Sequence, residues 1–292
     1  MSALASIPSP GSGEIEVGPL TLHAYGFTLL VAIVAATALA GVLWTRRGGE
    51  WDVVFSAAMW GVAGGIVGAR LYHVLTSWSE VPSPKWQGVF EVWEGGLGIW
   101  GGIAGGVLMG VWAARRAGVS AFALMDVVAP ALLLAQAIGR WGNYWNQELF
   151  GVPTDRPWGL EIDPENRPER YADSDTFHPL FLYESLWSLL GVLVLLLVWR
   201  SRRVRPPGLF CLYVAWYTFG RFFLEFVRTD EAHELLGLRL NNYVALALFL
   251  ASLAAFWWSQ RRAGPAPGEP ARPAPTPARS MAVPKGRVRP RR

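Results

Sequence analysis

Charged residues are scarce in this sequence. Asp, Glu, Lys and Arg make up 16% of its 292 residues, whereas hydrophobic residues make up 52%. A soluble surface needs roughly a quarter of all residues charged, so an ordinary soluble protein is excluded. A single cysteine, Cys211, also excludes a disulfide within the chain, and no Cys/His cluster is present. We therefore expect an integral membrane protein with no metal and no cofactor.

Basic residues are absent from residues 1–19, so the chain lacks the positively charged start of a cleavable signal peptide. Hydrophobic blocks follow, each near the roughly 20 residues that a membrane-spanning helix needs. We predict an all-α integral membrane protein with about seven transmembrane helices. They cover residues 20–44, 51–75, 97–114, 122–138, 180–199, 209–224 and 243–258.

Basic residues gather in every second connection and in the tail. They are Arg46, Arg47, Arg115, Arg116, four arginines between residues 200 and 205, and the arginines of residues 260–292. Because positive loops stay in the cytoplasm, we expect residues 1–19 outside and the C-terminus inside. Residues 20–259 then form the transmembrane catalytic domain, with a small external region at 139–178 between helices four and five. The basic tail, residues 260–292, is predicted to be disordered and cytoplasmic, and the net charge of +4 does not indicate a nucleic-acid partner.

Ionisable residues inside a membrane usually mark a function, because each costs about 2.5–3.5 kcal/mol at a helix centre. Four polar clusters occur at the predicted outer ends of the spans. The first contains Tyr25, and the second is WEGGLGIWGGIAGG, with Gly95, Gly96 and Trp100. Nearby Arg70 follows glycines at small-xxx-small spacing, which is typical of helix packing in membranes. We expect Arg70 to have a buried acidic partner, a lipid headgroup or a route to the membrane surface.

The third cluster is GRWGNYWNQELFG, residues 139–151. Arg140 and Asn143 lie three residues apart, so they can share a helix face, and Asn146 and Glu148 follow closely. Arginine binds phosphate through two parallel N–H groups, and amide side chains can donate to the remaining oxygens. The pattern favours a phosphate site over an interfacial turn.

The fourth cluster is YTFGRFFLEFVRTDEA, residues 217–232. Helical spacing predicts that Tyr217, Arg221, Glu225 and Arg228 share one face, with Arg221 paired to Glu225. His178 lies in FHPLFLYES, before the fifth span, where it is either a structural contact or a functional group. Together the clusters predict a positively charged, aromatic-walled pocket for an anionic amphiphile, with a phospholipid as the natural candidate.

Three other classes of membrane protein fit less well. A transporter would need ionisable residues near the midplane and paired broken helices, and no internal repeat is visible. A retinal receptor would need a lysine in the seventh span, which has none. An intramembrane protease would need a Ser/His or paired Asp arrangement inside the spans, and we find none.

These motifs resemble those of the prolipoprotein diacylglyceryl transferase family. The resemblance rests on AYG (24–26), WEGGLGIWGG (93–102), GRWGNYWNQELFG, HPLFLYE (178–184) and GRFFLEFVR (220–228), which occur in the expected order across residues 20–258. It implies an enzyme of the bacterial cytoplasmic membrane whose active site faces the outer leaflet. Its substrates would be phosphatidylglycerol and the lipobox cysteine of a preprolipoprotein, and its products a thioether and glycerol 1-phosphate.

The resemblance also implies roles for residues. Arg140 and Arg221 would bind the phosphate, Glu225 would position Arg221, and Asn143 would help to orient the headgroup. The expected catalytic residues are Arg140, Arg221, Glu148, Tyr25 and His178. The expected substrate-binding residues are Asn143, Asn146, Gly151, Tyr217, Glu225, Arg228, Gly95, Gly96 and Trp100.

One departure from the family pattern concerns the base that would activate the thiol. Many members have a histidine in the glycine-rich run where this chain has Trp100. If that histidine is the base, His178, Glu148 or Tyr25 must replace it here. Alternatively, no such base is needed, and stabilisation of the leaving phosphate provides most of the rate.

Overall fold

The computed structural model describes residues 6–11, 13–17, 20–230 and 234–261. Most of this part of the chain is helical. The helices are α1 (Ala24–Thr45), α2 (Trp51–Thr76), α3 (Lys85–Gly88), α4 (Ile99–Arg116), α5 (Ala121–Trp145), α6 (Leu180–Ser201), α7 (Gly208–Leu224) and α8 (Leu240–Arg261). The predicted disordered tail, residues 260–292, lies almost entirely outside the described residues.

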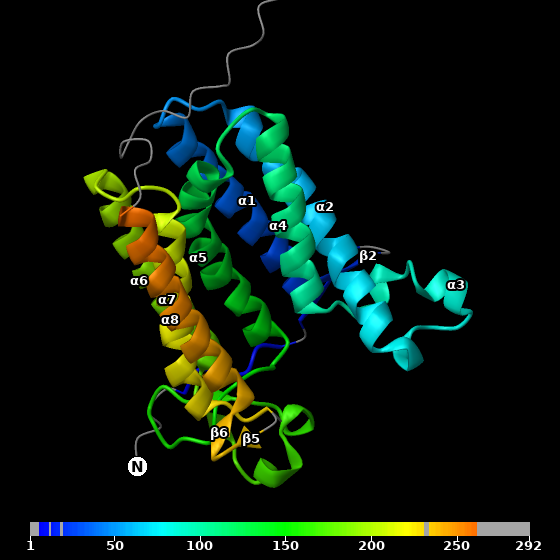
Figure 1. Cartoon of the computed structure of the whole chain (residues 1–292). Coiled ribbons are helices and arrows are strands. Elements are labelled where there is room, and N and C mark those ends of the chain that lie inside the picture. The colour runs from blue at the N-terminus through cyan, green and yellow to red at the C-terminus, as the bar shows by residue number, and fades with distance from the viewer. Residues whose placement is uncertain (1–5, 12, 18–19, 231–233, 262–292) are drawn as a thin grey trace, which may run out of the picture.

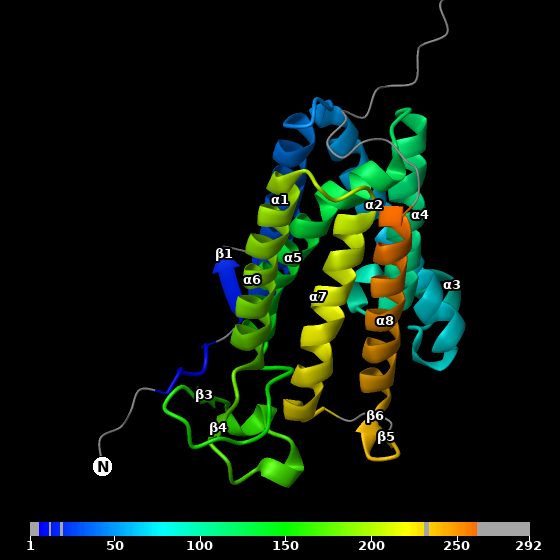
Figure 2. The ribbon, with the colours of Figure 1, turned by 60° about the vertical axis from the view of Figure 1, so that its left-hand side comes forward.

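The seven long helices form an elongated bundle (Figures 1 and 2). In it α2 packs chiefly on α4, α1 on α5, and α7 on α8. Apolar runs form these helices, while turn chemistry sets their ends: Ser120 caps α5 by accepting a hydrogen bond from the Ala123 N–H at 3.3 Å. Pro179 and Pro207 directly precede α6 and α7, at positions where proline is tolerated.

The prediction of an all-α fold is wrong in one respect, because three short antiparallel strand pairs lie outside the helices in the described part of the chain. They pair β1 (Glu14–Val17) with β2 (Leu20–His23), β3 (Leu160–Glu161) with β4 (Thr176–Phe177), and β5 (Glu234–Leu235) with β6 (Leu238–Arg239). The first predicted span therefore begins at Ala24 rather than at residue 20. Backbone pairing between neighbouring segments, not apolar length, decides this boundary.

Within the described residues, six helices are long and apolar enough to cross a membrane: Ala24–Thr45, Trp51–Thr76, Ala121–Trp145, Leu180–Ser201, Gly208–Val227 and Leu240–Arg261. Each coincides with a predicted span. The remaining predicted span forms α4, a helix of 18 residues whose five glycines and two arginines lower its hydropathy. The structure thus supports a multi-helix membrane protein and reproduces six of the expected spans by length and composition.

A small compact region, which we call the head (residues 146–179), joins α5 to α6 at one end of the bundle. Its core is made by the buried side chains of Phe150, Leu160, Ile162 and Phe177. Near the N-terminus, Ile7 extends the head by hydrogen bonding to Gly159 and Glu161 at 2.8 and 2.9 Å. The β5–β6 hairpin, which lies between α7 and α8 in the chain, is at this same end (Figure 1). The C-terminal ends of α5 and α7 and the first turn of α6 therefore lie at one end of the bundle.

Glycines allow α2 and α4 to pack closely, as their spacing predicts. A Cβ added to Gly64 would lie 2.8 Å from the Gly105 carbonyl oxygen, and one on Gly68 would lie 3.1 Å from the Gly105 Cα. Real Cβ atoms essentially never come within 3.0 Å of a neighbouring heavy atom. The two backbones therefore touch without intervening side chains.

The expectation for Arg70 is corrected by the structure. Its guanidinium donates to backbone carbonyls: to Gly95 at 2.7 Å, to Gly96 and Val89 at 3.1 Å, and to Gly88. Arg70 is 5% exposed, so a loop folded around it solvates the charge. We call the connection between α2 and α4, residues 77–98, the arm; it contains α3 (Figure 1). The hydrogen bonds from Arg70 attach the arm to α2.

Candidate active site at the head end of the bundle

The end of α5 carries the first group of predicted site residues. The helix continues to Trp145, seven residues beyond the predicted end of this span, so Arg140 and Asn143 lie on its last two turns. Arg140 Nη1 donates to Asn143 Oδ1 at 3.2 Å, and Asn143 Nδ2 donates to Glu148 Oε1 at 2.8 Å. Asn146 Nδ2 reaches the same Glu148 oxygen at 3.4 Å. The Asn143 amide therefore links Glu148 to Arg140, whereas Asn146 contacts Glu148 alone.

The backbone around Glu148 is held in an uncommon conformation. Gln147 and Leu149, on either side of it, have φ angles of 49° and 54°, in the left-handed region that costs energy for side chains other than glycine. The head holds this turn, because Gln147 Nε2 donates to Asp163 Oδ2 at 2.6 Å and Gln147 Oε1 accepts from the Asp163 N–H at 2.8 Å. The hydrogen bond that the Asp163 carboxylate accepts from Gln147, with one from Ser9, lowers the pKa of Asp163. The fold of the head thus fixes the position of Glu148.

Glu184, on the first turns of α6, is the carboxylate at which three arginines meet. Its Oε2 pairs with Arg140 Nε, while its Oε1 lies 3.4 Å from Arg221 Nη1 and 3.8 Å from Arg228 Nη1. We call these three arginines and Glu184 the arginine cluster. Sequence analysis included Glu184 only as the last residue of the HPLFLYE motif and gave it no role. The available signal was a glutamate on the first turns of an otherwise apolar helix.

A second carboxylate, that of Glu225, pairs with one arginine of the cluster. Glu225 is 1% exposed, and its Oε2 lies 2.8 Å from Arg221 Nη2, which confirms the predicted pair. Its Oε1 receives Arg239 Nε at 3.2 Å and Asn241 Nδ2 at 3.0 Å. Neither Arg239 nor Asn241 was predicted, because they come from β6 and α8 and are brought to Glu225 only by the fold.

Arg228 does not lie on the helix face that spacing predicts. Helix α7 ends at Leu224, a 3₁₀ turn covers Glu225–Val227, and Arg228 is extended. Its side chain nevertheless reaches the cluster, and its Nε donates to Asp230 Oδ1 at 2.6 Å. Burial by itself raises the pKa of Asp230, but hydrogen bonding and the charges of Arg228 and Arg239 lower it on balance.

Gly151 provides space rather than a side chain. Its N–H donates to the His178 carbonyl at 2.9 Å, and it forms a β-bridge with Arg228. A Cβ at this position would lie 2.7 Å from the His178 Cβ and 3.0 Å from the Val227 carbonyl oxygen. This glycine therefore lets the strand before His178 and the segment carrying Arg228 come together.

Two predicted tyrosines lie on the helices that carry the cluster or pack against them. The Tyr25 ring packs on Gly142 of α5, where an added Cβ would lie 2.6 Å from Tyr25 Cδ2. Tyr25 is thus next to Asn143 along α5. Tyr217 lies one turn before Arg221 on α7 and stacks on Tyr213, with ring centroids 6.5 Å apart.

His178 belongs to the head, and its ring contacts Tyr183 rather than the arginine cluster. Its Nδ1 lies 3.0 Å from the Tyr183 hydroxyl, which also accepts a hydrogen bond from Trp158 Nε1 at 2.8 Å. Partial burial, together with the positive charge of Arg156, lowers the pKa of His178 below its usual value. The imidazole is therefore neutral at pH 7 and can accept a proton.

The glycine-rich run lies in a different place. Gly95 and Gly96 accept hydrogen bonds from Arg70, and Trp100 stands on the first turn of α4 with 56% of its surface exposed. Within the described part of the chain, no hydrogen bond or ion pair links these three residues to the arginine cluster. A Cβ on Gly96 would lie 2.5 Å from His73 Nε2, so an imidazole on α2 is adjacent to the run.

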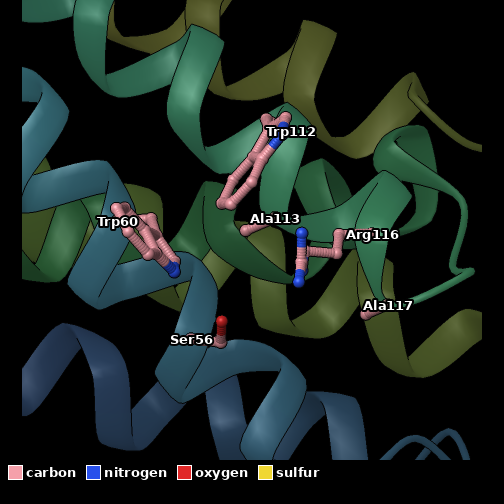
Figure 3. Close-up of a pocket in the computed structure, with 6 residues that line it drawn as sticks. All are labelled: Ser56, Trp60, Trp112, Ala113, Arg116 and Ala117. Atoms are coloured by element: carbon pink, nitrogen blue, oxygen red, sulfur yellow. The ribbon is translucent and has the colours of Figure 1, made fainter.

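A cavity lies at the end of α2 and α4 that is remote from the glycine-rich run. It has a volume of about 510 Å³ and is lined by Ser56, Trp60, Trp112, Ala113, Arg116 and Ala117 (Figure 3). Trp60 and Trp112 meet edge to face with centroids 5.1 Å apart, and the Arg116 guanidinium lies 5.5 Å from the Trp112 ring. Because α4 runs from the arm to Arg116, this cavity is separate from the candidate site. Among the described residues, no group of three His, Cys, Asp or Glu side chains is placed to hold a metal ion.

Comparison with known proteins agrees with the predicted motifs. The family model described as prolipoprotein diacylglyceryl transferase matches residues 13–258. The chain belongs to the prolipoprotein diacylglyceryl transferase family. The predicted resemblance and the predicted class of enzyme, a transferase, are thereby confirmed.

Relatives from several bacteria carry the family name. A phosphatidylglycerol–prolipoprotein diacylglyceryl transferase of Streptomyces coelicolor is 48% identical over 265 residues, covering 89% of this chain and 82% of its own. Its counterpart in Cutibacterium acnes is 46% identical, covering 89% and 88%, and that in Bifidobacterium adolescentis is 41% identical, covering 87% and 80%. The similarity thus covers nearly the whole described part of the chain.

Proposed function

We propose that this chain transfers the diacylglyceryl group of phosphatidylglycerol to the lipobox cysteine of bacterial preprolipoproteins, the first step of lipoprotein maturation. Both substrate classes occur in the names of its relatives. The observation that carries the assignment is the meeting of Arg140 and Arg221, from two separate helices, on one carboxylate. A place where two guanidinium groups bind one anionic group is suited to a phosphate ester.

The reaction is an alkyl transfer. The cysteine sulfur forms a bond to the glyceryl carbon that carries the phosphate, and the C–O bond to that phosphate breaks. The departing oxygen keeps the electron pair, so glycerol 1-phosphate leaves with more negative charge than the diester had. Arg140, Arg221 and Arg228 are already gathered at Glu184 before any substrate binds. Positively charged donors positioned in advance stabilise such a developing charge and so accelerate the step.

The thiol proton must go to a base, since the thiolate is the nucleophile. Trp100 cannot accept it. The sequence favours three candidates: His178, neutral at pH 7, Glu148 at the end of the amide chain, and Tyr25, which stands on α1 and packs on Gly142. His73 beside Gly96 is a further candidate. Full activity in His178→Ala and Glu148→Gln would exclude both as the required base.

We further propose that α4 spans the membrane as well, giving seven spans. The N-terminal segment and the head then lie outside, the catalytic domain covers residues 20–259, and the C-terminal tail lies in the cytoplasm of the bacterial cell. Arginines at the ends of α1, α4 and α6 that are remote from the head support this orientation. The active site would then face the outer leaflet.

A transfer assay tests the reaction. Purified full-length protein is mixed with phosphatidylglycerol and a peptide bearing a lipobox cysteine, and the peptide is weighed by mass spectrometry. We expect a gain of one diacylglyceryl mass, and no gain when the cysteine is replaced by serine. No gain on the cysteine peptide, while an active family member succeeds in parallel, would contradict the proposed function.

Substitutions test the phosphate site in the same assay. Arg140→Ala and Arg221→Ala should each lower the rate at least a hundredfold, on the order seen when one transition-state donor is lost, with the protein still in the membrane. Arg116→Ala, at the C-terminal end of α4 and far from the arginine cluster, is the matched control and should keep its activity. Full activity in both cluster variants would rule out this assignment.

A further inference from the structure

We propose that Glu184 is an internal anion in the phosphate position, which weakens binding of the phosphate monoester product and so promotes its release. The inference rests on the proposed function. It adds a role for one residue: Glu184 makes the site bind a singly charged phosphate in preference to a doubly charged one.

The first support is the placement of the carboxylates. Glu225 pairs with Arg221 Nη2 and Asp230 with Arg228 Nε, so each of these carboxylates contacts a single arginine of the cluster. Glu184 instead occupies the N–H groups that converge from two helices, Arg140 Nε and Arg221 Nη1. A phosphate bound by both arginines must therefore displace Glu184 or lie against it.

The second support is the balance of charge. Ion pairs among the described residues join four arginines, Arg140, Arg221, Arg228 and Arg239, to three carboxylates, Glu184, Glu225 and Asp230. These ion-paired side chains carry one net positive charge. Glu148 is not among them, because it reaches Arg140 only through the Asn143 amide. A phosphodiester carries one negative charge, whereas a phosphate monoester carries about 1.5 to 2 at pH 7. The group of seven side chains thus matches the substrate and repels the additional charge of the product.

Burial makes this repulsion effective. Glu184 is 7% exposed, so salt and water screen its charge weakly. Removing that charge stabilises a doubly charged phosphate more than a singly charged one. If Glu184 only braced the arginines, its loss would weaken binding of both phosphates.

The test measures binding of glycerol 1-phosphate to the purified full-length protein and inhibition of transfer by the same compound. Glu184→Gln should bind it on the order of tenfold more tightly than the natural protein, with a smaller change in KM for phosphatidylglycerol. Glu184→Asp, which keeps the charge, should bind it as weakly as the natural protein. Asp175→Asn, in an exposed ion pair of the head, is the matched control and should change nothing.

A second measurement needs no variant. The second ionisation of a phosphate monoester has a pKa of about 6, so the natural protein should bind glycerol 1-phosphate more tightly at pH 5.5 than at pH 7.5. Weaker or unchanged binding in Glu184→Gln overturns the inference, as does tighter binding by the natural protein at pH 7.5. If the natural protein fails to transfer the diacylglyceryl group at all, the proposed function itself is wrong.

Discussion

At the scale of single residues, the site depends on the absence of a side chain at position 151. Gly151 has no room for a Cβ, since one would lie 2.7 Å from the Cβ of His178. We predict that Gly151→Ala separates the segment carrying Arg228 from the head. Overpacking of this kind costs about 1–3 kcal/mol, and transfer activity should fall at least tenfold because Arg228 then leaves the cluster.

The measurement is the transfer assay, combined with thermal unfolding in detergent. Gly139→Ala is a suitable control, because nothing lies within 4 Å of a Cβ at Gly139, which is also near the end of α5. That variant should retain both activity and stability. An active, stable Gly151→Ala protein would show that the close approach is not needed.

At the scale of elements, three helices each contribute one part of the site. Arg140 and Asn143 lie on α5, Glu184 on α6 and Arg221 on α7. Helices α2 and α4 form a pair of their own, joined by glycine contacts. In that pair a Cβ on Gly105 would overlap the Gly64 backbone. We predict that Gly105→Ala lowers the free energy of unfolding by about 1–3 kcal/mol.

The matched control is Gly110→Ala in the same helix, where a Cβ would meet nothing within 4 Å. Alanine in a helix interior is favoured over glycine by roughly 0.5–1 kcal/mol, so this variant should unfold at the same or a slightly higher temperature. The readout is thermal unfolding in detergent, followed by tryptophan fluorescence. Equal destabilisation of both variants would mean that backbone contact is not what holds α2 to α4.

At the scale of the whole molecule, the two ends of the bundle differ in character. The arginine cluster lies at the head end, where carboxylates compensate it. The arginines at the other end, including Arg115 and Arg116, follow the helix ends. We predict that the head end faces outward, because uncompensated positive charge is retained in the cytoplasm.

Cysteine labelling tests this orientation. With Cys211→Ala as background, Ser79→Cys in the arm should react with a membrane-impermeant thiol reagent on intact cells, whereas Ser201→Cys at the end of α6 should react only after lysis. Both positions are exposed on the protein. The reverse pattern would invert the proposed topology.

The sequence by itself determined the class of protein, the positions of the long helices and the local part of the site. Apolar length fixes a span, because a bilayer has a set thickness. Arg140 with Asn143, and Arg221 with Glu225, could be predicted because side chains three or four residues apart meet on any helix. The order of the motifs along the chain also indicated the family.

Only the tertiary structure decided what the arginines bind. Glu184 lies 44 residues after Arg140 and 37 before Arg221, and Arg239 reaches Glu225 from a hairpin beyond α7. Arg70 likewise finds carbonyls 18 to 26 residues away. A buried charge must be compensated, but any carboxylate or carbonyl can do so, and helix periodicity does not say which one. Packing of the helices against one another makes that choice.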